Sequence, residues 1–128
     1  MRACLLALFL LLASCGPNSA EDFLNEADGI KRKIASELKQ IHTRDELAKA
    51  VPKLRKEFNE LVAVIIAART FHDQSEKPLD PEISDVSASQ QLLAELKRVY
   101  KIEAGRQLIE QAQQEALLKL DAYEQRKR

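Results

Sequence analysis

The sequence is short of the residues that build tight turns and aromatic cores. Its 128 residues include three glycines, four prolines and no tryptophan, which leaves little room for the turns of an all-β fold. Lys plus Arg and Asp plus Glu number 20 each, and a net charge of zero excludes the strongly basic footprint of a general nucleic-acid binder. The length allows one domain rather than two.

Catalytic motifs are also missing. The chain contains no G-x-S-x-G, no H-E-x-x-H, no glycine-rich phosphate loop and no C-x-x-C. Its two histidines, His42 and His72, fall at predicted helix ends, where a cation complements the helix dipole. We therefore expect no enzymatic activity, no metal site and no cofactor.

The apolar residues are concentrated at the N-terminus. Residues 1–14 contain 12 apolar residues and one charge, Arg2, and the uninterrupted apolar run covers residues 3–13. A membrane-spanning helix needs about 20 such residues. The run is instead typical of a secretory signal peptide.

A specific motif follows that run: Leu12, Ala13, Ser14 and Cys15. An aliphatic residue, two small residues and a cysteine resemble the lipobox of bacterial lipoprotein precursors. The resemblance implies lipid attachment to the Cys15 thiol and signal cleavage between Ser14 and Cys15. Since Gly16 rather than Asp follows, it also implies the outer membrane, facing the periplasm, if the cell is Gram-negative.

The domain organisation follows from this motif. We expect a signal peptide at 1–14, a lipid anchor and short tether at 15–18, and one helical domain at 19–128. Cys4 would leave with the signal, so the mature chain can form no internal disulfide. A tether of four residues reaches about 14 Å at most, which holds the domain against the lipid surface.

Apolar periodicity predicts helices in the mature chain. The first helix begins near Ser19, and its apolar face is Phe23, Ala27, Ile30, Ile34, Leu38 and Ile41. A capping box at 43–46 opens the second, whose heptad is Leu47, Val51, Leu54, Phe58, Leu61, Ile65 and Ala68. Pro52 either kinks this helix or, in the version we favour slightly, separates a short helix from a longer one that it opens.

The stretch 61–68 is apolar over a wide arc. This is typical of the middle helix of a bundle, which touches two neighbours; the alternative is a partner or oligomer surface at Val62 and Ile66.

Lys49, Lys53 and Lys56 form a basic face that could meet anionic headgroups, cell-wall polymer or an acidic partner. Because Glu57 and Glu60 lie four residues from two of these lysines, a solvated face with local ion pairs is the favoured interpretation.

The remaining residues predict a charged loop at 73–86 and a long C-terminal helix from about Ser84 or Ser87 to Tyr123. The apolar face of that helix changes near Gly105, which indicates a kink or a change of neighbour. The predicted fold is an all-α, antiparallel three-helix bundle, with or without a separate short helix before Pro52.

The sequence favours a structural or protein-interaction lipoprotein of the cell envelope. Its partners would be the membrane, through the lipid on Cys15, and an envelope protein or a second copy, with no nucleic acid or small-molecule substrate. The alternative is an assembly chaperone for an outer-membrane or secretion component, similar to the small helical pilotin lipoproteins.

Overall fold

The computed structural model describes residues 20–74 and 86–127, and these form four helices. The helices are α2 (Ala20–Lys39), α3 (Arg44–Gln74), α4 (Val86–Val99) and α5 (Gly105–Arg126). The predicted all-α bundle is confirmed. The predicted signal peptide, the lipobox with Cys15, the tether and most of the predicted loop lie outside the described residues.

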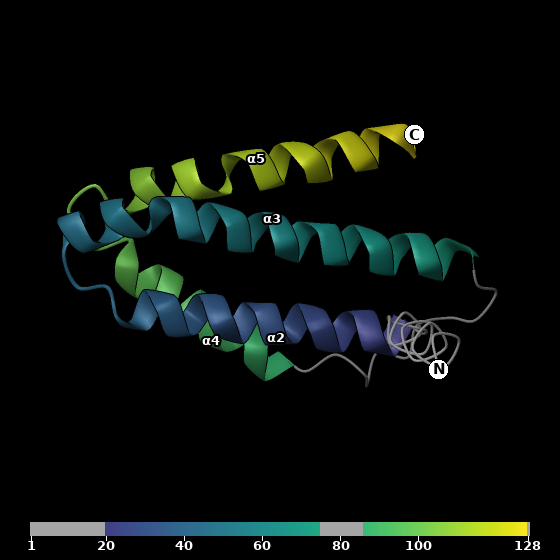
Figure 1. Ribbon diagram of the computed structural model, residues 1–128, viewed down its shortest axis with the longest axis horizontal. Coiled ribbons are helices and arrows are strands. Elements are labelled where there is room, and N and C mark those ends of the chain that lie inside the picture. Colours follow the sequence, from purple (N-terminus) through teal and green to yellow (C-terminus); the bar gives the residue numbers. More distant parts are fainter. Residues whose placement is uncertain (1–19, 75–85, 128) are drawn as a thin grey trace, which may run out of the picture.

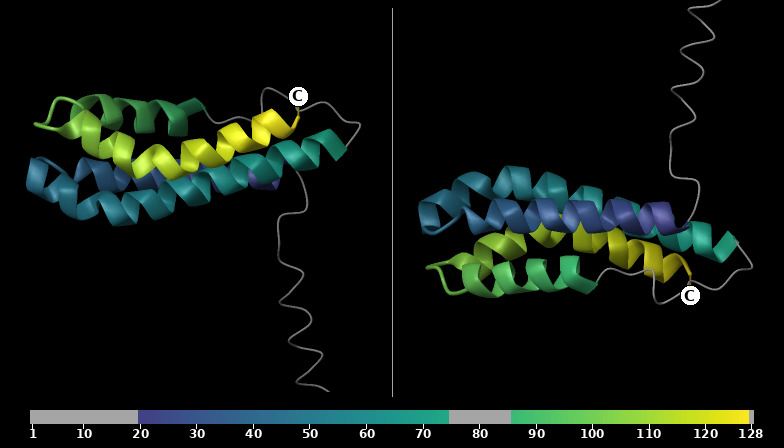
Figure 2. Two further views of the ribbon diagram at one scale, coloured as in Figure 1. Left: turned by 90° about the horizontal axis from the view of Figure 1, so that it is seen from above. Right: turned by 90° about the horizontal axis from the view of Figure 1, so that it is seen from below.

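The helices are arranged as two hairpins packed on each other (Figures 1 and 2). Helix α2 packs on α3 and α4, and α3 packs on α2 and α5, so the prediction that the second helix touches two neighbours is confirmed. Each hairpin is antiparallel, whereas α3 and α5 run in the same direction. Ion pairs at both ends show this, because Arg44 meets Glu103 near the start of these helices and Lys127 meets Asp73 at their end.

The hairpin of α4 and α5 differs from the predicted long helix. The chain reverses at residues 100–104, where Ala104 has a left-handed φ of 58°, and the N–H of Gly105 donates to the carbonyl of Ile102 at 2.8 Å. A Cβ atom on Gly105 would overlap the carbonyl oxygen of Val99. Glycine is therefore what lets α5 begin against the end of α4, and the reversal gives four helices instead of three.

Helix α3 is continuous through Pro52, so the predicted break before this proline is wrong. The predicted Thr43 cap at its start is confirmed, because the N–H of Glu46 donates to Thr43 Oγ1 at 3.2 Å. The Glu46 carboxylate accepts from the N–H of His42 at 3.4 Å, one residue before the position that a capping box uses. Proline supplies no N–H to the preceding turn, but Pro52 is exposed, so water can reach the unbonded carbonyl. Buried apolar residues on both sides of the proline hold the helix together: Leu47, Val51 and Leu54.

The core lies between the two hairpins and follows the predicted faces closely. Every residue of the predicted α3 heptad is buried except Ile65, which is half-buried. Helix α5 contributes one large side chain, Ile109, and otherwise small ones, Ala112 and Ala116. Small side chains at these positions let the backbone of α5 lie close to α3.

Arg98 of α4 also joins the two hairpins at the end where both turns lie. Its guanidinium donates to the carbonyls of Leu38 at 2.5 Å and Ile41 at 2.9 Å, and its Nε donates to Glu95 at 2.9 Å. The last carbonyls of a helix have no partner within the helix. Arg98 therefore adds, from α4, a second hydrogen bond to the Leu38 carbonyl, which also accepts from the N–H of Ile41 at 3.0 Å, and one hydrogen bond to the Ile41 carbonyl in the turn after α2.

The two glycines of the described helices predict opposite effects of substitution by alanine. Gly105→Ala should lower the free energy of unfolding by about 2–3 kcal/mol, because its Cβ would push into the backbone of Val99. Gly29→Ala should raise it by about 0.5–1 kcal/mol, because Gly29 is exposed within α2 and nothing lies within 4 Å of its added Cβ. Urea denaturation followed by circular dichroism measures both, and equal effects would contradict the structural role of Gly105.

Candidate functional site

The two residues predicted as a partner surface, Val62 and Ile66, lie beside a groove between α3 and α5. Val62 is only 7% exposed and belongs mainly to the core, so it offers little surface to a partner. Ile66 is half-buried. Together they line a groove of about 410 Å³, hereafter the α3–α5 groove, whose other lining residues are Ala63, Lys119, Ala122, Tyr123 and Arg126.

Small side chains create this groove. Ala63 on α3 and Ala122 on α5 are both exposed, and neither fills the space between the two parallel helices. The described lining contains two cations, Lys119 and Arg126, and no carboxylate. The groove is therefore apolar inside and positively charged at its edge, with Lys119 also 3.1 Å from Glu115 one turn earlier.

Ion pairs fix the position of α5 along the groove. Arg69 donates to Glu124 at 3.0 Å, and the Tyr123 hydroxyl donates to Asp73 at 3.4 Å. Lys127 also pairs with Asp73, and its hydrogen bond is the main reason that the pKa of this carboxyl is lowered. These contacts join the last turns of both helices, so the groove is held open by fixed walls.

Sequence reasoning missed most of this groove. It identified Val62 and Ile66 from the wide apolar arc of α3, but not Lys119, Ala122 or Arg126. Tyr123 was named only as the approximate end of the predicted C-terminal helix. No local pattern could reveal the groove, because its two walls are more than 50 residues apart in the sequence. They lie side by side only because the chain reverses between α4 and α5.

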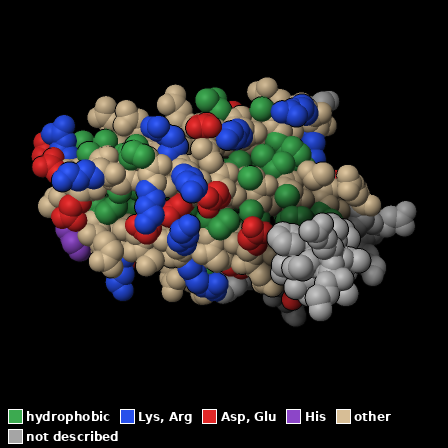
Figure 3. All heavy atoms as spheres, in the orientation of Figure 1, with side chains coloured by type: hydrophobic (Ala, Val, Ile, Leu, Met, Phe, Trp, Pro, Cys, Tyr) green, Lys and Arg blue, Asp and Glu red, His purple; other side chains and the backbone are tan. Residues whose placement is uncertain are grey.

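The predicted basic face lies elsewhere on α3. Lys49, Lys53 and Lys56 are exposed, but Lys53 pairs with Glu37 of α2 rather than with its own helix as predicted. Figure 3 shows the outer face of α2 and α3, where Lys and Arg side chains alternate with Asp and Glu across the middle. The mixed arrangement supports the interpretation of a solvated face over a continuous basic patch.

Glu57, expected to pair on the surface with Lys53, is instead buried between α2 and α3. The residue is 1% exposed, and neither carboxylate oxygen has a hydrogen-bond partner in the described part of the chain. The nearest cation is Lys33 Nζ, 3.8 Å away. Burial raises the pKa of Glu57, and the charge of Glu37 raises it further, while Lys33 and Lys53 oppose the shift.

The histidines lie where the sequence predicted. His42 is exposed in the turn before α3, and His72 is in the last turn of α3. Within residues 20–74 and 86–127, no three His, Cys, Asp or Glu side chains come together as a metal site.

Of the four described helices, none has the length and apolar character needed to cross a bilayer.

No protein-family model, no curated protein and no solved structure matches this chain. The surfaces of the bundle are therefore interpreted from their own chemistry.

The burial of Glu57 predicts how stability depends on pH. Below the pKa of an unfolded glutamate, about 4.3, the side chain is protonated in both states. As the pH rises through the raised pKa of the folded state, the folded protein loses stability, because it must ionise a buried group. Glu57→Leu should remove this loss and raise the free energy of unfolding at pH 8 by about 1–4 kcal/mol.

The measurement is urea denaturation at pH 4 and pH 8 for the wild type and Glu57→Leu. The difference between the two proteins should be larger at pH 8 than at pH 4. Glu26→Gln, at an exposed position of α2, is the matched control and should change stability little at either pH. A gain from Glu57→Leu that is equal at both pH values would contradict the ionisation argument.

Proposed function

We propose that this chain is a lipid-anchored envelope protein whose helical bundle binds another envelope protein, without enzymatic activity. The observation on which the binding role depends is the α3–α5 groove, an apolar hollow with cations at its edge. The anchor depends on the lipobox at 12–15. The groove is formed by the described helices and the anchor is inferred from the sequence motif alone, so either can be wrong without the other.

The chemistry of the groove indicates the kind of segment it accepts. Ile66 and Tyr123 supply apolar surface, and Arg126 supplies an exposed positive charge. A bound segment with apolar and acidic side chains would bury the apolar surface of Ile66 and Tyr123 and would form an ion pair with Arg126. We therefore propose that the partner presents an acidic, amphipathic segment to this groove.

The orientation of the bundle supports contact with an envelope protein. Helix α2 begins at the same end of the bundle at which α3 and α5 finish (Figure 1), and the α3–α5 groove lies toward that end. A chain anchored at Cys15, five residues before α2, would hold the groove near the membrane surface. A membrane-associated partner is within reach there.

The anchor predicts a simple change of location. Cys15→Ser should release the protein from the membrane fraction, because acyl chains on Cys15 contribute about 0.8 kcal/mol for each buried CH₂ group. Fractionation followed by immunoblotting measures this. Cys4→Ser is the matched control and should stay with the membrane, since Cys4 belongs to the predicted signal. Unchanged membrane retention of Cys15→Ser would refute the anchor.

The groove predicts a localised contact in the native envelope. A photo-crosslinking amino acid at Ala122 should give a discrete product, whereas the same group at Ala48, exposed near the opposite end of α3, should not. Mass spectrometry should find an apolar, acidic segment in the crosslinked peptide. Ala63→Glu should abolish the product with helicity unchanged, because it places a negative charge within the groove.

Two outcomes would contradict this proposal. One is the same product from Ala48 and Ala122, which would indicate random collision. The other is a product that survives both Ala63→Glu and Ile66→Asp while circular dichroism shows folded protein. If either occurs and Cys15→Ser is still released from membranes, the binding site is wrong and the anchor stands.

A further inference from the structure

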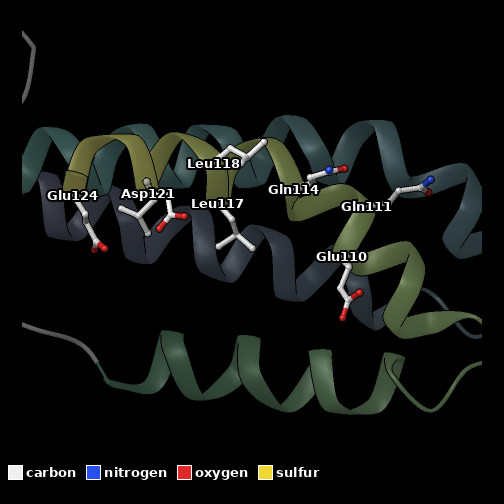
Figure 4. A pocket seen from close by; sticks show the side chains of 8 residues that line it. Glu110, Gln111, Gln114, Leu117, Leu118, Asp121 and Glu124 are labelled. Atoms are coloured by element: carbon white, nitrogen blue, oxygen red, sulfur yellow. The ribbon is translucent and has the colours of Figure 1, made fainter. Parts of the chain in front are cut away.

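Helix α5 exposes a second apolar surface that no intramolecular contact of the described residues uses. Leu117 and Leu118 are 56% and 62% exposed, although removing a leucine side chain from water is favourable. Both line a hollow of about 660 Å³ whose described lining comes from α5 alone. We call it the outer α5 groove; Figure 4 shows its side chains.

The charge of the outer α5 groove is opposite to that of the α3–α5 groove. Its described lining includes Glu110, Asp121 and Glu124 and contains no Lys or Arg. Glu124 is paired with Arg69. Glu110 and Asp121 are exposed and form no ion pair with any described residue, so two carboxylates are available to a partner.

The arrangement along the helix fits an elongated ligand. The lining runs from residue 110 to residue 124, which at 1.5 Å per residue is about 21 Å, or four helical turns. In Figure 4, Glu110, Leu117 and Glu124 project toward the side on which α4 lies, and Gln111, Gln114 and Leu118 lie along the opposite edge of α5. Polar and acidic side chains therefore flank the two leucines.

We propose that the outer α5 groove binds an amphipathic helix that carries leucine-like side chains on one face and Lys or Arg at its edges. Such a helix would bury Leu117 and Leu118 and place cations beside Glu110 and Asp121. This inference depends only on α5 residues and does not require the α3–α5 groove to be a binding site. If both sites operate, the bundle is an adaptor that holds two partners of opposite charge.

Charge separates this occupant from the other candidates. A membrane with anionic headgroups would be repelled by the carboxylates of this groove. In a symmetric pair of copies the same patch meets itself, which would bring Glu110 and Asp121 toward their own counterparts. The segment 75–85 has four acidic residues and one lysine, so its charge does not complement the groove either.

Two synthetic peptides test the proposal. Each is an 18-residue helix with leucine on one face; one has lysine and the other glutamate on the remaining positions. The full chain, reconstituted in nanodiscs of uncharged phosphatidylcholine, is titrated with each labelled peptide, and empty nanodiscs give the background. On the Ala63→Glu background, which keeps the acidic peptide out of the α3–α5 groove, the Leu/Lys peptide should bind at least tenfold more tightly than the Leu/Glu peptide, and raised salt should reduce this preference.

Variants on exposed positions locate the binding. Leu118→Glu should weaken the Leu/Lys peptide about tenfold or more, because it removes apolar surface from the groove. Glu110→Lys combined with Asp121→Lys should weaken it about tenfold and strengthen the Leu/Glu peptide. Leu93→Glu, at a leucine of α4 that is 51% exposed, is the matched control and should change neither affinity.

Each remaining outcome overturns the inference. Equal binding of the two peptides would show that charge does not select the partner, and binding unaffected by Leu118→Glu would place the peptide elsewhere. A wild-type dimer in sedimentation that Leu118→Glu dissociates would identify a second copy as the occupant. Ala63→Glu should leave the affinity for the Leu/Lys peptide unchanged, so failure here is distinguishable from failure of the α3–α5 groove.

Discussion

The contact between the end of α4 and the end of α2 determines how the rest of the bundle is arranged. Arg98 donates hydrogen bonds to the carbonyl of Leu38 in the last turn of α2 and to that of Ile41 just after it, and shortly afterwards Gly105 begins α5 against the Val99 carbonyl. The first contact sets α4 parallel to α2, and the second sends α5 back along α3. Once both are in place, α5 can lie only beside α3, and the positions of both grooves follow.

Local patterns in the sequence were sufficient for α2, α3 and much of the core. The capping box at 43–46 and the heptad from Leu47 to Ala68 predicted α3 well, because burial of one face repeats every three or four residues. The break predicted before Pro52 is wrong because the low helix propensity of proline was considered without the residues packed around it. Three buried neighbours stabilise the helix there, and the cost of a missing N–H is reduced by exposure to water.

Contacts between distant segments were not predictable in the same way. The face change near Gly105 was visible, but whether it meant a kink or a full reversal depends on the Val99 carbonyl, to which no sequence pattern points. Similarly, the spacing of Lys53 and Glu57 suggested an ion pair on the surface. In the structure Lys53 pairs with Glu37 of α2, and Glu57 is buried. The α3–α5 groove depends on the chain reversal before Gly105, and only its α3 wall could be predicted.

The common end at which α2 begins and α3 and α5 finish has a practical consequence for attached groups. A fluorescent domain fused after α5 would lie close to the start of α2, beside any anchor that precedes it. A group inserted in the turn at 40–43 would lie at the far end of α2, about 30 Å away along a helix of 20 residues. With an acceptor dye in the lipid, a donor placed at each of these two positions in turn would report the tilt of the bundle relative to the membrane surface.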